Sequence, residues 1–376
     1  MNLIFWLDTP PVCCRGVFDK VSEKWSGKTY YICMHGIGGV RQKITEQEET
    51  YGKAHLILLN QQESSAEFIN QFLQEHKEDI HIFNGYKSAT SVYLDQLLAL
   101  YPQAKTIVWA ERPGPPKWKI QFPFSLYHRI HSFKYADKIS ALLPLGKEGV
   151  RLYASYGWSK EKLFEFLYSP VMSENLPIQT KKEEYPVKFI LLGRFAKGAK
   201  GMDLFIESFS YLKHKNCQIT LVGGYGDLKD ETLRFIEQNA PITQFGGTWP
   251  IAKACDNLNK FDVCVVPSRF EGWNVTINEA LMAGIGCIAS DECVSQELIK
   301  YSGAGKIVKA CKPKELAAAM DEVIENPSLI QQWKQKASAY RAKISNDSNA
   351  AYLIEILNYL FVKNKQGARP KVPWEI

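Results

Sequence analysis

The feature that most constrains the fold is an alternation of short apolar runs with helical patterns along the chain. In the first half the runs are LIFWL, TYYICM, AHLILL, DIHIFN and KTIVWA, and in the second half VKFILLG, CQITLVG, ITQFGG, FDVCVVPS and GIGCIAS. Apolar strands that alternate with helices are typical of parallel sheets covered on both faces. The sequence therefore predicts two α/β units, each a doubly wound, Rossmann-like domain.

The length of 376 residues also suits two domains, because single hydrophobic cores rarely grow beyond about 250–300 residues. Ser169–Pro186 is polar, contains three prolines and has no periodicity. We predict a first domain at 1–172, a linker at 173–186, a second domain at 187–346, and a C-terminal helix at 347–376 that packs back on the first domain. Ligands of such sheets bind at the carboxyl ends of the strands, so a site is expected in a cleft between the domains.

Charge, cysteine usage and the apolar runs limit the possible partners and the cellular compartment of the protein. The net charge of +6 and the pI of about 8.6 favour anionic partners. The nine cysteines are scattered without a CxxC pair, which favours a reduced compartment and no structural metal. The opening MNLIFWLD does not resemble a signal peptide, and no run of eighteen apolar residues occurs. We expect a cytoplasmic protein that does not span a membrane.

The stretch SRFEGWNVTINEALMAG, Ser268–Gly284, follows a buried strand and opens a helix. The free amides and the positive dipole end at a helix start suit an anion such as phosphate. Thr276 and Glu279 also fit a T-x-x-E capping box, in which Glu279 would only bond back to the cap amide. The residues alone leave both interpretations of Glu279 open.

Five motifs in the second half resemble the retaining glycosyltransferases of family 4, or glycosyl transferases group 1. They are LLGRF, KGMDLFIESF, LVGGYG, DVCVVPSRFEGWNVTINEALMAGIGCIASD and the later GAGKIV, and their order and spacing match as well. In the first half, ALLPLGKEGVRLYASYGWSKEKLFEF resembles the segment that closes the family's acceptor domain. The resemblance implies the GT-B fold, two Rossmann-like domains facing a central cleft, and metal-independent sugar transfer with retention.

The resemblance also implies roles for the charged residues of the second domain. Glu279 would bind ribose hydroxyls, Glu271 would face the donor sugar, and Arg194 and Lys200 would grip the diphosphate. The alternative for Arg194 and Lys200 is that both are solvated cations on the protein surface. One extra residue in the spacing leaves Lys197 as a competitor of Lys200.

The remaining donor candidates are loop residues. The resemblance implies that the backbone of Gly272, Trp273 and Asn274 lines the sugar and the phosphate, although Asn274 stands where most relatives have glycine. The donor-binding candidates are Glu279, Gly272, Trp273, Asn274, Val275, Thr276, Gly223, Gly224, Tyr225, Lys197, Gly16 and Arg15, and the catalytic candidates are Glu271, Arg194, Lys200 and Glu111.

The first domain offers weaker signals. Relatives carry a paired-glycine loop after the first strand, where this chain has only Gly16, preceded by Arg15. HGIGG, His35–Gly39, is better interpreted as a flexible turn. Glu111 ends a strand where it could face the acceptor, or simply cap a helix. His128, like His35, is more often structural in such a context.

Residues 105–138 mix seven Lys or Arg with aromatic side chains. Such a mixture suits peripheral contact with an anionic membrane at its inner face. Leu126, Ile130 and Phe133 share a helical face, so core packing is the alternative. Nucleic acid is disfavoured because no recognition motif occurs.

The resemblance implies a hexosyl- or N-acetylhexosaminyl-transferase. It would act on a lipid-linked glycan of a cell-surface polysaccharide such as lipopolysaccharide, O-antigen or capsule. The co-substrate would be a nucleotide sugar, UDP-sugar being favoured and GDP-sugar the alternative, with no cofactor and no metal. The rival functions are a glycoside hydrolase, a GT-B nucleotide-sugar epimerase and a non-catalytic membrane-associated scaffold.

Overall fold

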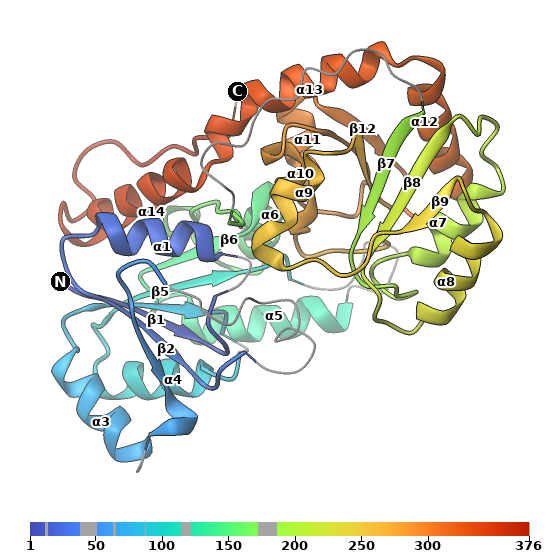
Figure 1. Cartoon of the computed structure of the whole chain (residues 1–376). Helices are drawn as coiled ribbons and strands as arrows, with labels where there is room; N and C mark the ends of the chain where they lie inside the picture. Colours follow the sequence, from blue (N-terminus) through green and yellow to red (C-terminus); the bar gives the residue numbers. More distant parts are fainter. Residues whose placement is uncertain are drawn as a thin grey trace. The chain divides into compact units, whose positions relative to one another are not determined.

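The computed structural model describes residues 1–11, 14–37, 51–62, 65–86, 88–113, 122–171 and 186–375. The chain forms two compact units (Figure 1). Unit 1 takes in the described residues of Met1–Pro115 and Lys119–Ser169 together with Asn346–Pro373, and unit 2 takes in those of Pro170–Ser345. The predicted linker 173–186 lies outside the described residues except for Pro186.

Unit 1 is built on a six-stranded parallel sheet with flanking helices (Figure 1). The strands are β1 (Leu3–Leu7), β2 (Thr29–Cys33), β3 (His55–Leu58), β4 (Ile80–Asn84), β5 (Lys105–Ala110) and β6 (Ala141–Pro144). The helices are α1 (Arg15–Lys24), α3 (Ser65–Glu75), α4 (Ser91–Leu100), α5 (Phe122–Tyr135), α6 (Gly146–Ser155) and α14 (Asn346–Phe361). All five residues of β1 are buried, which explains why this strand is apolar at every position.

Unit 2 is built on a second six-stranded parallel sheet. The strands are β7 (Val187–Leu192), β8 (Cys217–Val222), β9 (Thr243–Phe245), β10 (Val263–Val266), β11 (Gly286–Ser290) and β12 (Gly305–Val308). The helices are α7 (Met202–Phe209), α8 (Lys229–Gln238), α9 (Ala254–Leu258), α10 (Val275–Met282), α11 (Gln296–Ser302), α12 (Pro313–Glu325) and α13 (Ser328–Tyr340).

The two sheets share one strand order, and this order indicates where ligands bind. It is β3-β2-β1-β4-β5-β6 in unit 1 and β9-β8-β7-β10-β11-β12 in unit 2. The predicted doubly wound parallel sheets are confirmed, although the short edge strands β6 and β12 were not among the predicted strands. Such sheets bind ligands outside the carboxyl ends of their strands, where the strand order reverses. The relevant loops therefore follow β1 and β4 in unit 1, and β7 and β10 in unit 2.

The C-terminal helix α14 lies beside α1 in unit 1 (Figure 1). A Cβ atom on Gly16 of α1 would come within 2.4 Å of Asn346 Oδ1, so glycine permits this close approach. The helix ends at Phe361, whereas the prediction extended it to residue 376. Asn364 and Lys365 have positive φ angles, which an α-helix does not accommodate.

Across the described residues, none of the helices combines the length and the apolar character needed to cross a bilayer.

Candidate functional site

Two glycine-containing loops meet at the carboxyl edge of the unit 2 sheet. Gly193 follows β7 with φ 152°, and Gly223 follows β8 with φ 157°. A Cβ atom on Gly223 would lie 2.1 Å from the Gly193 carbonyl oxygen, so the approach of the two backbones requires glycine. The predicted loop of Gly223, Gly224 and Tyr225 therefore lies beside the residues that follow β7. Phe195 of that segment donates its N–H to the Tyr225 carbonyl oxygen at 2.8 Å.

The loop after β7 is fixed to the loop after β10 by contacts within unit 2. Gly201, the residue before α7, has φ 64°, and a Cβ atom there would meet the Pro267 carbonyl oxygen at 2.4 Å. Arg269 donates to both carboxylate oxygens of Asp203 at 2.6 Å, and also to the Lys197 carbonyl oxygen. Burial would raise the pKa of Asp203, but the hydrogen bonds and charge of Arg269 lower it overall. Sequence reasoning missed Arg269, although it directly follows a buried strand and Ser268.

Lys200 and Glu271 form an ion pair within this cluster. Lys200 Nζ lies 2.7 Å from Glu271 Oε1, with the side chains 24% and 17% exposed. Ser268 Oγ donates to the same Oε1 at 3.3 Å. The structure therefore brings together two of the predicted catalytic residues, a cation from the loop after β7 and a carboxylate from the loop after β10.

Helix α10 begins at Val275, with Asn274 as its N-cap. Asn274 Oδ1 accepts the N–H of Thr276 at 3.0 Å, and Ser295 Oγ donates to the Asn274 carbonyl oxygen at 2.9 Å. The capping box considered for Thr276 and Glu279 is wrong, because Thr276 already lies inside the first turn and Glu279 is in the second. Asn274, which departs from the family's glycine, supplies the cap itself.

Glu279 is buried in unit 2 with 4% of its surface exposed. Within the described residues its carboxylate accepts no hydrogen bond. Burial raises its pKa from an ordinary 4.5 to about 7, and the charge of Lys200 offsets part of that rise. Buried carboxylates are normally hydrogen-bonded or paired, so the carboxylate of Glu279 has acceptor capacity that no described residue uses.

The other donor candidates of unit 2 differ in what they can offer. The Trp273 side chain is buried, and its Nε1 donates to Asn278 Oδ1 at 2.8 Å, so the backbone of Trp273 is the part left for a ligand. Arg194 and Lys197 are exposed and form no ion pair among the described residues. The Lys197 N–H is used by Asp227 Oδ1 at 3.2 Å. Because the ammonium of Lys200 reaches Glu271, Lys200 is the lysine of the two that lies in the cluster with Glu271.

Unit 1 has a cavity of about 380 Å³ outside the carboxyl ends of β1, β4 and β5. The residues that line it include Asp8, Asn84, Tyr86, Trp109, Glu111 and His128. Glu111, the predicted acceptor-side residue, accepts a hydrogen bond from Tyr168 at 2.9 Å. His128 is buried, with Nδ1 3.4 Å from the Tyr86 hydroxyl. The cavity lies where the strand order of unit 1 reverses.

The two donor candidates of unit 1 are engaged within that unit. Arg15 lies 3.3 Å from Asp19 one turn along α1, and Gly16 is buried against Asn346. Burial raises the pKa of Asp19 to about 6, although Arg15 opposes the rise. His35 is exposed two residues after β2, and the last two glycines of HGIGG lie outside the described residues. The described residues contain no group of three or more His, Cys, Asp or Glu placed to hold a metal ion.

Helix α5 presents an apolar face to solvent. Its large exposed side chains are Phe122, Phe124, Leu126, Tyr127, Ile130 and Phe133. Core packing is wrong for Leu126, Ile130 and Phe133, the last of which is 91% exposed. Trp109 and Tyr135 of the same basic and aromatic segment are buried, so the described part of the segment divides between core and surface, while residues 114–121 lie outside the described residues.

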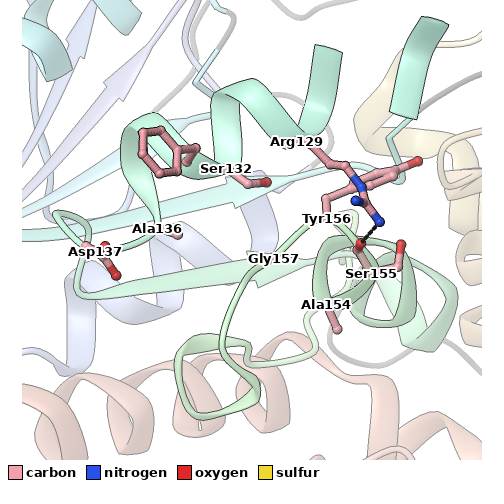
Figure 2. Close-up of a pocket in the computed structure, with 9 residues that line it drawn as sticks. Arg129, Ser132, Ala136, Asp137, Ala154, Ser155, Tyr156 and Gly157 are labelled. Carbon is pink, nitrogen blue, oxygen red and sulfur yellow. Dashed lines mark hydrogen bonds between the residues drawn. The ribbon is translucent and has the colours of Figure 1, made fainter. Parts of the chain in front are cut away.

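A second cavity of unit 1, about 390 Å³ in volume, lies between the second half of α5 and the end of α6 (Figure 2). Arg129 points from α5 towards α6 and donates to the Ser155 carbonyl oxygen at 3.4 Å (Figure 2). Phe133 and Asp137 also line the cavity. This cavity adjoins the exposed face of α5 and contains both a cation and a carboxylate.

Known proteins resemble the chain in sequence over unit 2 and in structure over nearly its whole length. The family model described as "Glycosyl transferases group 1" matches residues 172–340. Anabaena Alr3699/HepE in complex with UDP aligns with a TM-score of 0.73 at 14% identity, covering 95% of this chain and 100% of that one. A glycosyltransferase from Rickettsia africae aligns at 0.69 and 17% identity, covering 96% and 99%. WaaG, a glycosyltransferase involved in lipopolysaccharide biosynthesis, aligns at 0.65 and 13% identity, covering 94% and 99%. No curated protein sequence matches the chain.

At these identities the structural likeness shows the fold, which is the GT-B fold implied by the sequence motifs. The family match spans Lys200, Glu271 and Glu279. The cluster at the carboxyl edge of unit 2 therefore lies within the part of the chain that the family model describes.

Proposed function

We propose that the protein is a glycosyltransferase that moves a sugar from a nucleotide-sugar donor to a glycan acceptor. The observation that carries this proposal is the gathering of Lys200, Glu271 and the buried Glu279 at the carboxyl edge of unit 2. A lysine beside a helix start suits the diphosphate, because both favour negative charge. The carboxylate of Glu279, which accepts no hydrogen bond from the described residues, suits the two hydroxyls of a ribose. The match to the family model supports the same function.

The donor in this proposal is a UDP-sugar that carries a hexose or an N-acetylhexosamine. The structures of Anabaena Alr3699/HepE contain UDP and UDP-glucose, and their fold is that of this chain. The loop from Gly272 to Thr276 would line the sugar and the phosphates with its amides. Arg194 and Lys200 would balance the charge that develops on the leaving diphosphate.

The reaction in this proposal proceeds with retention and without a metal, as the motifs shared with family 4 imply. The bond from the anomeric carbon to the phosphate oxygen breaks, and the acceptor hydroxyl oxygen bonds to the same face of that carbon. The hydroxyl proton passes to the leaving phosphate, whose charge Lys200 helps to hold. Glu271 accepts hydrogen bonds from the donor sugar in this scheme.

A thermal-shift and product assay tests the proposal. UDP should raise the Tm and UDP-sugars should release UDP when an acceptor glycan is present. The Glu279→Ala variant should lose the UDP-dependent shift, while Glu237→Ala, an exposed residue of α8, should keep it. A Tm shift with GDP and none with UDP would identify the donor as a GDP-sugar. Interconversion of nucleotide sugars without transfer would identify an epimerase, and release of sugar from a glycan without nucleotide would identify a hydrolase.

The proposed acceptor is a lipid-linked glycan of a cell-surface polysaccharide, met at the inner face of the membrane. The exposed apolar face of α5 supports this part of the proposal. Exposure of Ile130 and Phe133 to water is unfavourable, and transfer of these side chains into a bilayer interface would lower the free energy. Arg129 lines a cavity together with Phe133, and Lys138 is exposed three residues after α5, so both suit anionic head groups. Similarity to WaaG is compatible with such an acceptor.

Sedimentation with vesicles tests the membrane contact. The protein should bind phosphatidylglycerol-containing vesicles, and a double Ile130→Ser, Phe133→Ser variant should bind about tenfold less with an unchanged Tm. Val92→Ser, which alters an equally exposed apolar residue on α4, is the control. Equal binding of all three proteins would show that the exposed face of α5 does not form the membrane contact, and would leave the proposed sugar transfer untouched. If none of the three binds vesicles, the membrane contact itself is excluded.

A further inference from the structure

Two buried polar atoms without a partner in the described part of the chain belong to residues that line the cavity at the carboxyl edge of unit 1. They are Asp8 Oδ1, just after β1, and Trp109 Nε1, on β5. Buried carboxylate oxygens and indole N–H groups are normally hydrogen-bonded, because an unpaired one costs free energy. One of these atoms needs a donor and the other needs an acceptor. A ligand that carries hydroxyl groups offers both.

The chemistry of the lining narrows the ligand further. Among the described residues that line the cavity, Asp8 and Glu111 carry carboxylates and Arg112 carries a guanidinium. This balance disfavours a phosphate or an acidic sugar. The rings of Tyr86 and Trp109 supply flat apolar walls, which suit the C–H faces of a sugar ring. The volume of about 380 Å³ is in the range of small-molecule sites, about 300–1,000 Å³.

We propose that this cavity binds one neutral sugar ring of the acceptor glycan. Hydroxyl groups of that ring donate a hydrogen bond to Asp8 and accept one from Trp109 Nε1. Asp8 is then a specificity-determining residue, because a phosphate or carboxylate at the same place on the sugar meets its negative charge. This inference rests on the proposed function, since it identifies the acceptor side of the same reaction.

The structure also makes an uncommon prediction about stability. Among the described residues the buried Oδ1 of Asp8 has no hydrogen-bond partner, so Asp8→Asn replaces an unsatisfied carboxylate with a neutral amide of the same size. The Tm of the variant should therefore stay the same or rise, while sugar binding falls. A residue that only supports the fold would show the opposite change in Tm.

The experiment measures binding of methyl glycosides of glucose, galactose, mannose and N-acetylglucosamine by saturation-transfer NMR on the full chain. Asp8→Asn and Trp109→Phe should each weaken the best-bound glycoside about tenfold, and a 6-phosphate on that glycoside should abolish its binding to the wild type. Asp137→Asn, which alters the second cavity of unit 1, should bind as the wild type does. The UDP-dependent Tm shift should be equal in all four proteins.

The outcomes separate the two proposals. If the wild type binds UDP and transfers sugar while both cavity variants bind the glycosides unchanged, the cavity assignment fails and the glycosyltransferase stands. A lowered Tm of Asp8→Asn, or tight binding of the 6-phosphate, also overturns the assignment. If UDP does not bind and no sugar is transferred, the proposed function fails, and with it the acceptor role of a cavity that still binds glycosides.

Discussion

The carboxyl edges of the two sheets share a strand order but differ in charge. In unit 2, Lys200 pairs with Glu271 beside the start of α10, and Glu279 is buried nearby. In unit 1, the corresponding edge has two carboxylates, aromatic rings and an indole N–H without a partner among the described residues. Under the two proposals, the same backbone arrangement would serve an anion at one edge and a neutral polyol at the other. Topology sets where each ligand binds, and side-chain charge sets what binds there.

The largest effect should come from removing the cation of unit 2. Lys200→Gln should lower kcat/KM by about 100- to 1,000-fold and abolish the UDP-dependent Tm shift, because it removes charge stabilisation from the leaving diphosphate. Glycoside binding to unit 1 should not change. Lys197→Gln is the matched control and should cost less than about threefold. If the two lysines rank in the reverse order, the diphosphate contact belongs to Lys197.

The buried carboxylate of unit 2 should make stability depend on pH. The folded protein holds the Glu279 proton up to a pKa of about 7, whereas the unfolded chain releases it near 4.5. The contribution of the Glu279 proton to the free energy of unfolding is therefore complete below pH 4.5 and is lost as the pH rises through 7. The loss is up to about 3 kcal/mol, at 1.36 kcal/mol per pKa unit.

Urea unfolding of the wild type and of Glu279→Gln at pH 5 to 8 measures this dependence. The stability advantage of the variant should grow with pH and level off above pH 7. A difference in the free energy of unfolding that stays constant across this range would show that Glu279 keeps one protonation state. The edge of unit 2 would then have no residue that titrates between pH 5 and 8 at this position.

The start of α10 should depend on Asn274 and not on Thr276. Asn274→Ala should lower the free energy of unfolding by about 1 kcal/mol, because it removes the N-cap hydrogen bond to the Thr276 amide. Thr276→Val keeps the shape of the side chain and should cost less than about 0.5 kcal/mol. Chemical denaturation of both variants decides, and a larger loss for Thr276→Val would restore the capping box.

The smallest effect concerns salt. Raising NaCl from about 50 to about 500 mM should weaken UDP binding several-fold, because exposed charges such as Arg194 are screened. Binding of neutral glycosides to unit 1 should change by less than about 1.5-fold, since hydrogen bonds to uncharged hydroxyls carry little of that dependence. Equal salt sensitivity at both edges would erase the proposed difference in charge.

Sequence reasoning succeeded where a residue's environment is set by its neighbours in the chain. Strands such as β1 and β8 are buried on both faces, so their apolar runs stand out. The edge strands β6 and β12 have four residues each, and β12 is only partly buried, so no long apolar run marks them. Helix α5 shows a further limit, because periodicity tells which residues share a face but not which face meets the core.

Within the candidate site, spacing alone could not decide the role of Glu279. The cap residue of α10 is Asn274, two positions earlier than the capping box requires, and this shift places Glu279 in the interior. Asp8 gave no sequence signal, since a single aspartate after a strand is common at turns. Its interest arises from Trp109, 101 positions later in the sequence, which lines the same cavity.

The ion pair of Lys200 and Glu271 has a consequence for turnover. A diphosphate that attracts Lys200 leaves Glu271 without its counter-ion, and a sugar hydroxyl can then satisfy that carboxylate. In the proposed reaction, an intact nucleotide sugar would compensate both partners, whereas the nucleoside diphosphate product would compensate only the lysine. Such a site would bind the nucleotide sugar more tightly than the nucleoside diphosphate product. The ion pair between Lys200 and Glu271 would form again as the product leaves, which would favour product release before the next donor binds.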